Sequence, residues 1–210
     1  MNKKAYSNLL KFIIAIVILS LLLAKPIMLI PHSVYNINNK PIFDLGFHIT
    51  DRIYQIPQTQ CDSKFIYERT NELVLAVLII YMFYSLNVDI ILRFAYCLIL
   101  LQILKRLLAI STVLPNPERN KCYPLYNVQN PLKGTCNDLF FSGHFIMLNL
   151  VGYMIWRFMW SPTLGGLYTI FYLFSVYWNL SCQYHYTIDI LASIPITLFV
   201  AILMFRNVQN

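Results

Sequence analysis

The sequence predicts an all-α integral membrane protein, folded as a six-transmembrane-helix bundle. Of its 210 residues, 58% are hydrophobic and only 12% are charged, and the mean hydropathy is +0.58. A soluble globular domain carries roughly a quarter charged residues, so this composition excludes that class. The chain has room for six spans of about 20 residues each and for two substantial loops. We therefore expect one membrane-embedded domain over residues 1–210.

Six apolar stretches, delimited by polar residues, are the predicted spans. They lie at about 9–30, 66–87, 90–114, 142–160, 163–181 and 186–205. The first stretch follows Lys3, Lys4 and Lys11, as the apolar part of a signal peptide would. However, Leu22-Leu23-Ala24 is a poor cleavage site, and the apolar run resumes after Lys25-Pro26. We expect this first span to be retained.

Basic residues orient the predicted bundle. Those at the two chain ends and in the short connections fall on one side of a six-span protein: Lys3, Lys4, Lys11, Arg93, Arg157 and Arg206. The positive-inside rule makes that side cytosolic, so the long loops 31–65 and 115–141 face the lumen or the exterior, although they also hold basic residues. An endomembrane (Golgi or ER) and the plasma membrane both fit. The net charge of +7 suits anionic lipid head groups, and nothing points to nucleic acid.

Two histidine clusters mark the outer ends of two predicted spans. Ser142-Gly143-His144 begins the fourth span, and His185-Tyr186-Thr187-Ile188-Asp189 begins the sixth. A lone His more often caps a helix, but ionisable residues at membrane spans are costly to keep, and two such clusters favour a functional site. His185 and Asp189 share a helix face, where a carboxylate can hold the imidazole in one tautomer. We expect His144, His185 and Asp189 to form one active site.

Three chemistries would use these residues. A zinc site would take His144, His185, Asp189 and Asp138 as ligands, in a spacing unlike that of common zinc motifs. A Ser-His-Asp hydrolase would use Ser142, but Ser-Gly-His is not a G-x-S-x-G nucleophile elbow. Phosphoryl transfer through a phosphohistidine employs both imidazoles and the carboxylate. We favour this third chemistry, which needs no metal and no cofactor.

The two clusters extend into longer motifs. Cys136-Asn137-Asp138-Leu139-Phe140-Phe141-Ser142-Gly143-His144 and His185-Tyr186-Thr187-Ile188-Asp189 resemble the C-G-D-x-x-F-S-G-H and H-Y-T-x-D segments of sphingomyelin synthases and related ceramide phosphotransferases. Pro41-Ile42-Phe43-Asp44 resembles that family's P-x-x-D in the first outer loop, and the stretch from Lys105-Arg106 to Pro115 resembles its R…T-x-L-P. Asn137 stands where the family usually has Gly, and Phe145 where a Thr is usual.

The resemblance implies a six-span enzyme that moves a phospho-head group from a glycerophospholipid to ceramide and releases diacylglycerol. It implies that His185 is the nucleophile, that Asp189 orients it, and that His144 protonates the departing diacylglycerol and then activates the ceramide hydroxyl. Membrane lipids are the partners that this activity requires. The head group, which is phosphocholine, phosphoethanolamine or phosphoinositol, and homo-oligomer formation stay open.

Other function classes also stay open. Lipid phosphate phosphatases and phospholipase C-like hydrolases of the same superfamily end on water, but the phosphatase signature has an Arg six residues before the second His, where this chain has Asn179, and a K-x6-R-P stretch that this chain lacks. The fat-storage-inducing membrane proteins generally have Glu in place of Asp189. A non-catalytic lipid-binding or transport protein would keep such residues for binding or as a proton relay.

Five further residues are candidate substrate ligands: Lys105, Arg106, Asp138, Ser142 and Tyr186. Lys105 and Arg106 are predicted near mid-bilayer, where either would hold a donor phosphate or snorkel to the surface. Asp138 would contact a choline or ethanolamine cation or cap the fourth span. Tyr186 would offer a ring face to such a cation or anchor the interface.

Cysteines also bear on the compartment. Four of the five fall on the predicted outer side: Cys61, Cys122, Cys136 and Cys182. An oxidising compartment permits a disulfide there, and the sequence leaves its pairing open.

Overall fold

The computed structural model describes residues 43–54, 56–57, 60–61, 64–111, 141–159 and 161–208, of which 64–69, 106 and 109–111 by their backbone alone. This part of the chain is built of helices, which confirms the all-α prediction. They are α3 (Leu45–Ile53), α5 (Lys64–Ser85), α6 (Val88–Ser111), α7 (Gly143–Met154), the π-helical turn η2 (Ile155–Met159), α8 (Pro162–Ser181) and α9 (Thr187–Phe205).

Five of the predicted spans correspond to helices with ends within three residues of those expected, when α7 and η2 are taken together as the span 142–160. The first span, at 9–30, lies outside the described residues. Within the described part, α9 is the one helix that is long and apolar enough to cross a membrane, judged by length and composition. The six-span arrangement therefore stays a prediction. The predicted outer loop 31–65 contains an element that the sequence analysis did not anticipate, the helix α3.

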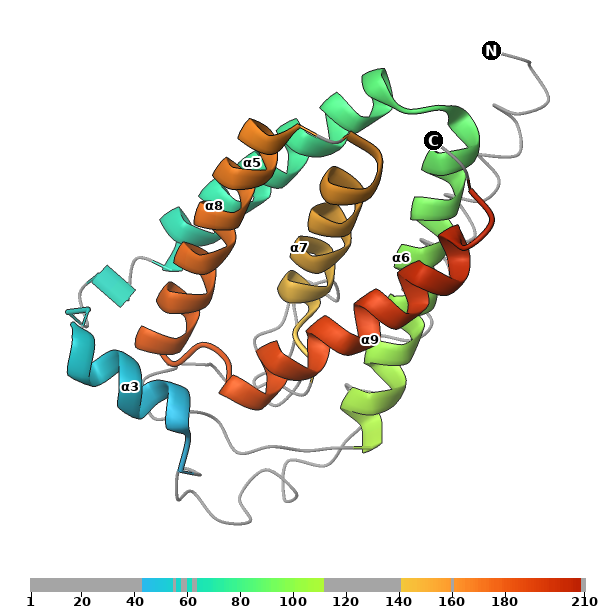
Figure 1. Ribbon diagram of the computed structural model, residues 1–210. Coiled ribbons are helices and arrows are strands. Elements are labelled where there is room, and N and C mark those ends of the chain that lie inside the picture. Colours follow the sequence, from blue (N-terminus) through green and yellow to red (C-terminus); the bar gives the residue numbers. More distant parts are fainter. Residues whose placement is uncertain are drawn as a thin grey trace.

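Helix α7 occupies the centre of the described bundle. It contacts α5, α6, α8 and α9, and in Figure 1 it lies between the pair α5 and α8 on one side and the pair α6 and α9 on the other. Half of its residues are apolar with fully buried side chains: Phe145, Ile146, Leu148, Leu150, Val151 and Met154. A helix that is apolar on most faces is typical of a protein core or of a membrane span.

Side-chain caps fix where the central helices begin. Ser142 precedes α7, and its hydroxyl accepts a hydrogen bond from Phe145 N at 3.5 Å. Ser161 precedes α8 in the same way, accepting from Leu164 N at 3.3 Å, and Pro162 occupies the first helical turn, where its missing N–H costs nothing. These caps satisfy N–H groups that helix starts otherwise leave unpaired.

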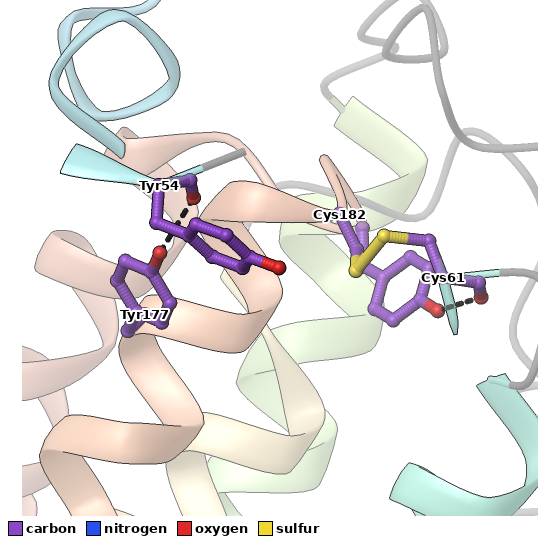
Figure 2. Close-up of a disulfide and its surroundings, with 5 residues drawn as sticks. Tyr54, Cys61, Tyr177 and Cys182 are labelled. Atoms are coloured by element: carbon purple, nitrogen blue, oxygen red, sulfur yellow. Dashed lines mark hydrogen bonds between the residues drawn. A yellow bond between two sulfur atoms is a disulfide. The ribbon is translucent and has the colours of Figure 1, made fainter. Parts of the chain in front are cut away.

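A disulfide ties the segment after α3 to the end of α8. Cys61 and Cys182 are bonded, with their Cα atoms 5.3 Å apart, and the pairing that the sequence left open is thereby set for these two. Figure 2 shows the bond beside a hydrogen bond from Tyr177 Oη to the carbonyl of Tyr54, 2.6 Å long. Tyr184 donates to the carbonyl of Cys61. The segment around Cys61 is therefore fastened covalently three residues from His185.

Candidate active site

The two histidine clusters meet at one end of the bundle. His144 is in the first turn of α7, and His185 lies in the short turn that joins α8 to α9. A backbone hydrogen bond from Ser142 N to the carbonyl of Asp189, 3.4 Å long, connects the clusters directly. Residues more than forty positions apart in the sequence thus share one small region, as the sequence analysis expected.

His185 lies between a hydroxyl and a carboxylate. Its Nε2 is 3.1 Å from Ser142 Oγ, and its Nδ1 is 3.7 Å from Asp189 Oδ2. The Asp189 side chain is fully buried, at 0% exposure, whereas 13% of the His185 side chain is accessible. Asp189 Oδ2 also accepts a hydrogen bond from Tyr186 N at 3.0 Å, which fixes the carboxylate at the start of α9.

The position of Asp189 favours one tautomer of the imidazole, although Nδ1 at 3.7 Å from Oδ2 is beyond hydrogen-bonding distance. A proton on Nδ1, facing Asp189, leaves on Nε2 a lone pair that can accept from the Ser142 hydroxyl. A lone pair directed away from an orienting carboxylate is what a nucleophile or a general base requires. The buried negative charge of Asp189 then stabilises the positive charge that develops on the ring.

His144 completes a pair of imidazoles. Its ring centroid is 6.4 Å from that of His185, with the planes inclined at 63°, and His144 is exposed. Reacting groups approach one another to about 3–3.5 Å before bonds form, so two rings at this separation are near enough to act on one substrate group. One imidazole can attack on one side while the other gives a proton to the leaving oxygen.

Lys105 lies beside the same turn. It is buried, with 8% exposure, and its Nζ would be 3.2 Å from a Cβ placed on Gly143. The ammonium group is thus next to the N-terminal turn of α7, whose partial positive charge also favours anions. Gly143 leaves the space that this lysine occupies. Two positive features therefore lie at the start of α7, beside the cluster that contains His144.

Two non-glycine residues with left-handed backbone precede the clusters. Phe141, just before Ser142, has φ 70°, and Gln183, two residues before His185, has φ 52°. Such a conformation costs a non-glycine residue of order 1–3 kcal/mol and is kept where the fold demands a sharp change of direction. These turns aim Ser142 and His185 at one another, and no feature of the residue types Phe and Gln would have indicated them.

Asp44 is a residue of the site region that the sequence analysis noted by resemblance but gave no role. Its Oδ2 accepts from Thr187 N at 2.7 Å, its Oδ1 accepts from Thr187 Oγ1, and Thr187 Oγ1 in turn accepts from Gly46 N at 3.0 Å. Thr187 is the residue midway between His185 and Asp189. The P-x-x-D pattern was the available signal, but it did not reveal the partner.

The positions of the other predicted substrate ligands indicate less about their roles. Tyr186 is buried, and its ring stacks on Phe47 with centroids 5.6 Å apart. Arg106 lies on α6, with its side chain outside the description, and Asp138 lies outside the described residues. In the described part, no three or more His, Cys, Asp or Glu side chains are grouped to hold a metal ion. The Asn179 amide, where phosphatases have Arg, donates to the carbonyl of Ser175 at 2.8 Å.

Part of the chain also matches the model of a known protein family. Residues 135–207 match the family model described as the C-terminal part of the PAP2 superfamily. The match covers about a third of the chain and includes both histidine clusters, and it supports the lipid-phosphatase-like superfamily with phosphoryl-transfer or hydrolysis chemistry on lipids. It does not separate phosphatases from phosphotransferases. No solved structure matches the chain.

Proposed function

We propose that this chain is a sphingomyelin synthase-like phosphotransferase, which moves a phospho-head group from a glycerophospholipid to ceramide. The observation that carries the proposal is the placement of His185 between Ser142 Oγ and Asp189, 6.4 Å from the ring of His144. The PAP2 match supports the lipid phosphoryl chemistry, and the C-N-D-L-F-F-S-G-H and H-Y-T-I-D motifs favour ceramide phosphotransferases within it.

The reaction runs in two halves. In the first, His185 Nε2 forms a bond to the head-group phosphorus, the bond from phosphorus to the diacylglycerol oxygen breaks, and His144 gives that oxygen a proton. In the second, His144 takes the proton of the ceramide hydroxyl, whose oxygen bonds to phosphorus as the bond to His185 breaks. Asp189 supports the imidazolium character of His185 throughout, and Lys105 stabilises the charge on the phosphoryl oxygens.

The disulfide supports a lumenal or exoplasmic active site. Cys182 is three residues from His185, and its bond to Cys61 is at the same end of the bundle. Disulfides form and persist in oxidising compartments, which lie on the non-cytosolic side of a membrane. This agrees with the orientation that the basic residues favour.

The geometry also favours a second candidate, a serine nucleophile. Ser142 Oγ, His185 and Asp189 are in the order of a Ser-His-Asp triad, with a contact of 3.1 Å between hydroxyl and imidazole. In such a hydrolase His185 would act as a base, and the covalent intermediate would be on Ser142. The chemical stability of the trapped intermediate separates the two routes, because a P–N bond breaks in acid and a phosphoserine bond survives it.

One assay tests the proposal. The purified full chain, in phospholipid vesicles containing phosphatidylcholine, phosphatidylethanolamine and phosphatidylinositol, is supplied with a fluorescent ceramide, and the labelled product is identified by mass. We expect a ceramide carrying one of the three head groups, formed together with an equal amount of diacylglycerol. In a parallel sample whose vesicles also contain phosphatidic acid, release of phosphate without any labelled product would assign the chain to the phosphatases instead. A chelator should leave the rate unchanged, because the scheme contains no metal-activated water.

A further inference from the structure

Helix α3 has three distinct faces. At about 100° per residue, its nine residues fall into three consecutive sectors of the helix circumference. One sector is apolar and exposed, with Leu45 at 59%, Ile49 at 48% and Ile53 at 69% exposure. The next sector faces the protein, and the third is polar and exposed; their members are Gly46, Thr50 and Phe47, and then Asp51, His48 and Arg52.

The protein-facing sector fastens α3 to the segment 185–189, which holds His185 and Asp189 and is called the catalytic turn below. Gly46 N donates to Thr187 Oγ1, and Phe47 stacks on Tyr186, so both contacts are with the segment between His185 and Asp189. A Cβ on Gly46 would be 2.1 Å from Thr187 Oγ1, which shows how closely the two helices approach. In Figure 1, α3 lies across the end of the bundle where α8 ends and α9 begins, which its contacts with both helices confirm.

The exposed half of α3 therefore meets two different environments. An apolar stripe of three large side chains adjoins a stripe with two opposite charges and a histidine, on a helix backed by protein. Water alone would not stabilise the apolar stripe, and a hydrocarbon environment would exclude the charged one. A helix that lies in the plane of a lipid surface meets both phases at once, with its apolar side among the acyl chains and its polar side among the head groups.

We propose that α3 is an in-plane membrane-interface helix, which seats the catalytic turn at the head-group level of the bilayer. Its apolar stripe contacts lipids at the boundary between the head groups and the acyl chains. Aromatic side chains flank the helix at both ends, Phe43 with 78% and Tyr54 with 59% exposure, as is common at membrane interfaces. The inference rests on the membrane placement in the proposed function, but not on ceramide as the acceptor.

A second copy of the chain is a weaker occupant. A stable protein interface buries about 800 Å² on each partner, far more than three side chains on one short helix present. A larger interface around this stripe would also cover Asp51 and Arg52 and would have to pair their charges. Contact with a lipid surface requires neither a large protein interface nor partners for these charges.

The position of α3 explains how His185 would reach the phosphate group of a phospholipid. The phosphorus of a phospholipid lies at the level of the head groups, above the acyl chains. Because Asp44 and Gly46 bind Thr187, the depth of α3 sets the depth of His185. A catalytic turn held at that level meets the phosphate without lifting the lipid out of the bilayer.

Photocrosslinking tests the proposal directly. The full chain is placed in phosphatidylcholine vesicles with the photoreactive residue p-benzoylphenylalanine at position 49, on the apolar stripe, or at position 51, on the polar stripe. Position 199 is the reference, because Phe199 on α9, the described helix that is long and apolar enough to span, is 65% exposed. After irradiation, lipid adducts are measured by mass. We expect adducts at 49 and 199, and at least severalfold fewer at 51. Each variant is first checked for the intact Cys61–Cys182 bond on a non-reducing gel.

The outcomes separate this inference from the proposed function. Lipid adducts at 199, with position 49 no more reactive than 51, would overturn the role of α3 and leave the membrane placement standing. Crosslinking of position 49 to a second chain would overturn it in favour of an interface between copies. Absence of lipid adducts at both 49 and 199 would overturn the membrane placement itself.

A functional comparison gives a second readout. The double variant Ile49→Gln, Ile53→Gln makes the apolar stripe polar, whereas Asp51→Asn, His48→Gln is the matched change on the polar stripe. We expect the first to lower turnover of lipid in vesicles by about tenfold and to leave turnover of short-chain lipid in detergent micelles unchanged, and the second to change neither. Equal losses in vesicles and micelles for the first variant would contradict an interfacial role.

Discussion

Asp44 and Thr187 join the starts of two helices through one carboxylate. Asp44 accepts from Phe47 N at 3.1 Å as the N-cap of α3, and from Thr187 N at 2.7 Å in the first turn of α9. The negative charge therefore lies at the N-termini of two helices, where the helix dipoles favour it. Because Thr187 is between His185 and Asp189, this carboxylate helps to define the position of the turn that holds His185.

We expect the Asp44 contact to matter for turnover as well as for folding. Asp44→Asn keeps an N-cap for α3, since Asn caps helices about as well as Asp, but replaces the oxygen that accepts from Thr187 N. Thr187→Ala removes the hydroxyl and leaves the α3 cap intact. Each change should lower kcat roughly tenfold, about 1.4 kcal/mol, with a smaller effect on KM.

The double variant provides the control for this coupling. The two changes remove different hydrogen bonds, one from Thr187 N and one from the Thr187 hydroxyl, but both bonds join the same two helix starts. A loss in the double variant that falls short of the sum of the single losses would show that the residues act together, whereas fully additive losses would show that Asp44 acts elsewhere. The apparent Tm of all three proteins, measured alongside, identifies any loss that is due to unfolding.

The predictable part of the site is local in the sequence. Ser142 with His144, and His185 with Asp189, are each close in the sequence, so the two motifs alone indicated these residues. The expected shared helix face of His185 and Asp189 was wrong, because α9 begins at Thr187 and His185 lies in the turn before it. Apolar length likewise indicated α5 to α9 within a few residues. The contacts that hold these pieces together are not local: Asp44 and Thr187 are 143 residues apart, and Cys61 and Cys182 are 121 apart. No pattern within a short window specifies such partners.

Helix α3 shows a different reason for a missed element. Its apolar residues Leu45, Ile49 and Ile53 are spaced as on one helix face. In a soluble globular protein, such a face would be buried. In the structure it is exposed, and the buried side is made by Gly46, Thr50 and Phe47. Gly46, which lets α3 approach Thr187 closely, adds nothing to an apolar pattern. The sequence of the predicted loop 31–65 therefore did not indicate a helix that faces the protein.

His185 and Asp189 should be indispensable to different degrees. His185→Ala removes the nucleophile and should abolish transfer while the protein stays folded and membrane-inserted. Asp189→Asn keeps the shape but loses the charge that supports the imidazolium, and should lower kcat by roughly two or more orders of magnitude. Product formation from fluorescent ceramide measures both, and a loss below tenfold for Asp189→Asn would assign it a structural role.

Ser142→Ala distinguishes the two covalent routes. If His185 is the nucleophile, the variant loses the hydrogen bond to His185 and the N-cap of α7, each of about 1 kcal/mol, and should keep turnover within roughly tenfold of the wild type. It should also still take up radiolabelled head group from phosphatidylcholine, in an acid-labile and alkali-stable bond. An unlabelled Ser142→Ala protein, together with an acid-stable label on the wild type, would establish the serine route.

The disulfide should contribute both to stability and to the shape of the site. Removing a native disulfide commonly costs about 2–5 kcal/mol, and the loop closed here is long. We expect Cys61→Ser, Cys182→Ser, or treatment with a reductant, to lower the apparent Tm and the activity together. Cys97→Ala is the control, because Cys97 is a free buried thiol in the described part of the chain and closes no loop. A reductant effect that persists in the double serine variant would point to another bond.

The order of the two half-reactions gives the most decisive test of the phosphohistidine scheme. Because His185 would hold the head group after diacylglycerol leaves, the wild type without ceramide should release diacylglycerol in one burst and then stop. The burst should approach one equivalent per active site, and a rapid quench followed by lipid analysis measures it. His144→Ala should slow the burst as well as the transfer to ceramide, since the same imidazole gives the proton in the first half and takes it in the second, whereas His185→Ala should show no burst at all. Continuous diacylglycerol release without ceramide would mean that water replaces the acceptor, and the complete absence of a burst in an active enzyme would show direct transfer between two lipids bound together.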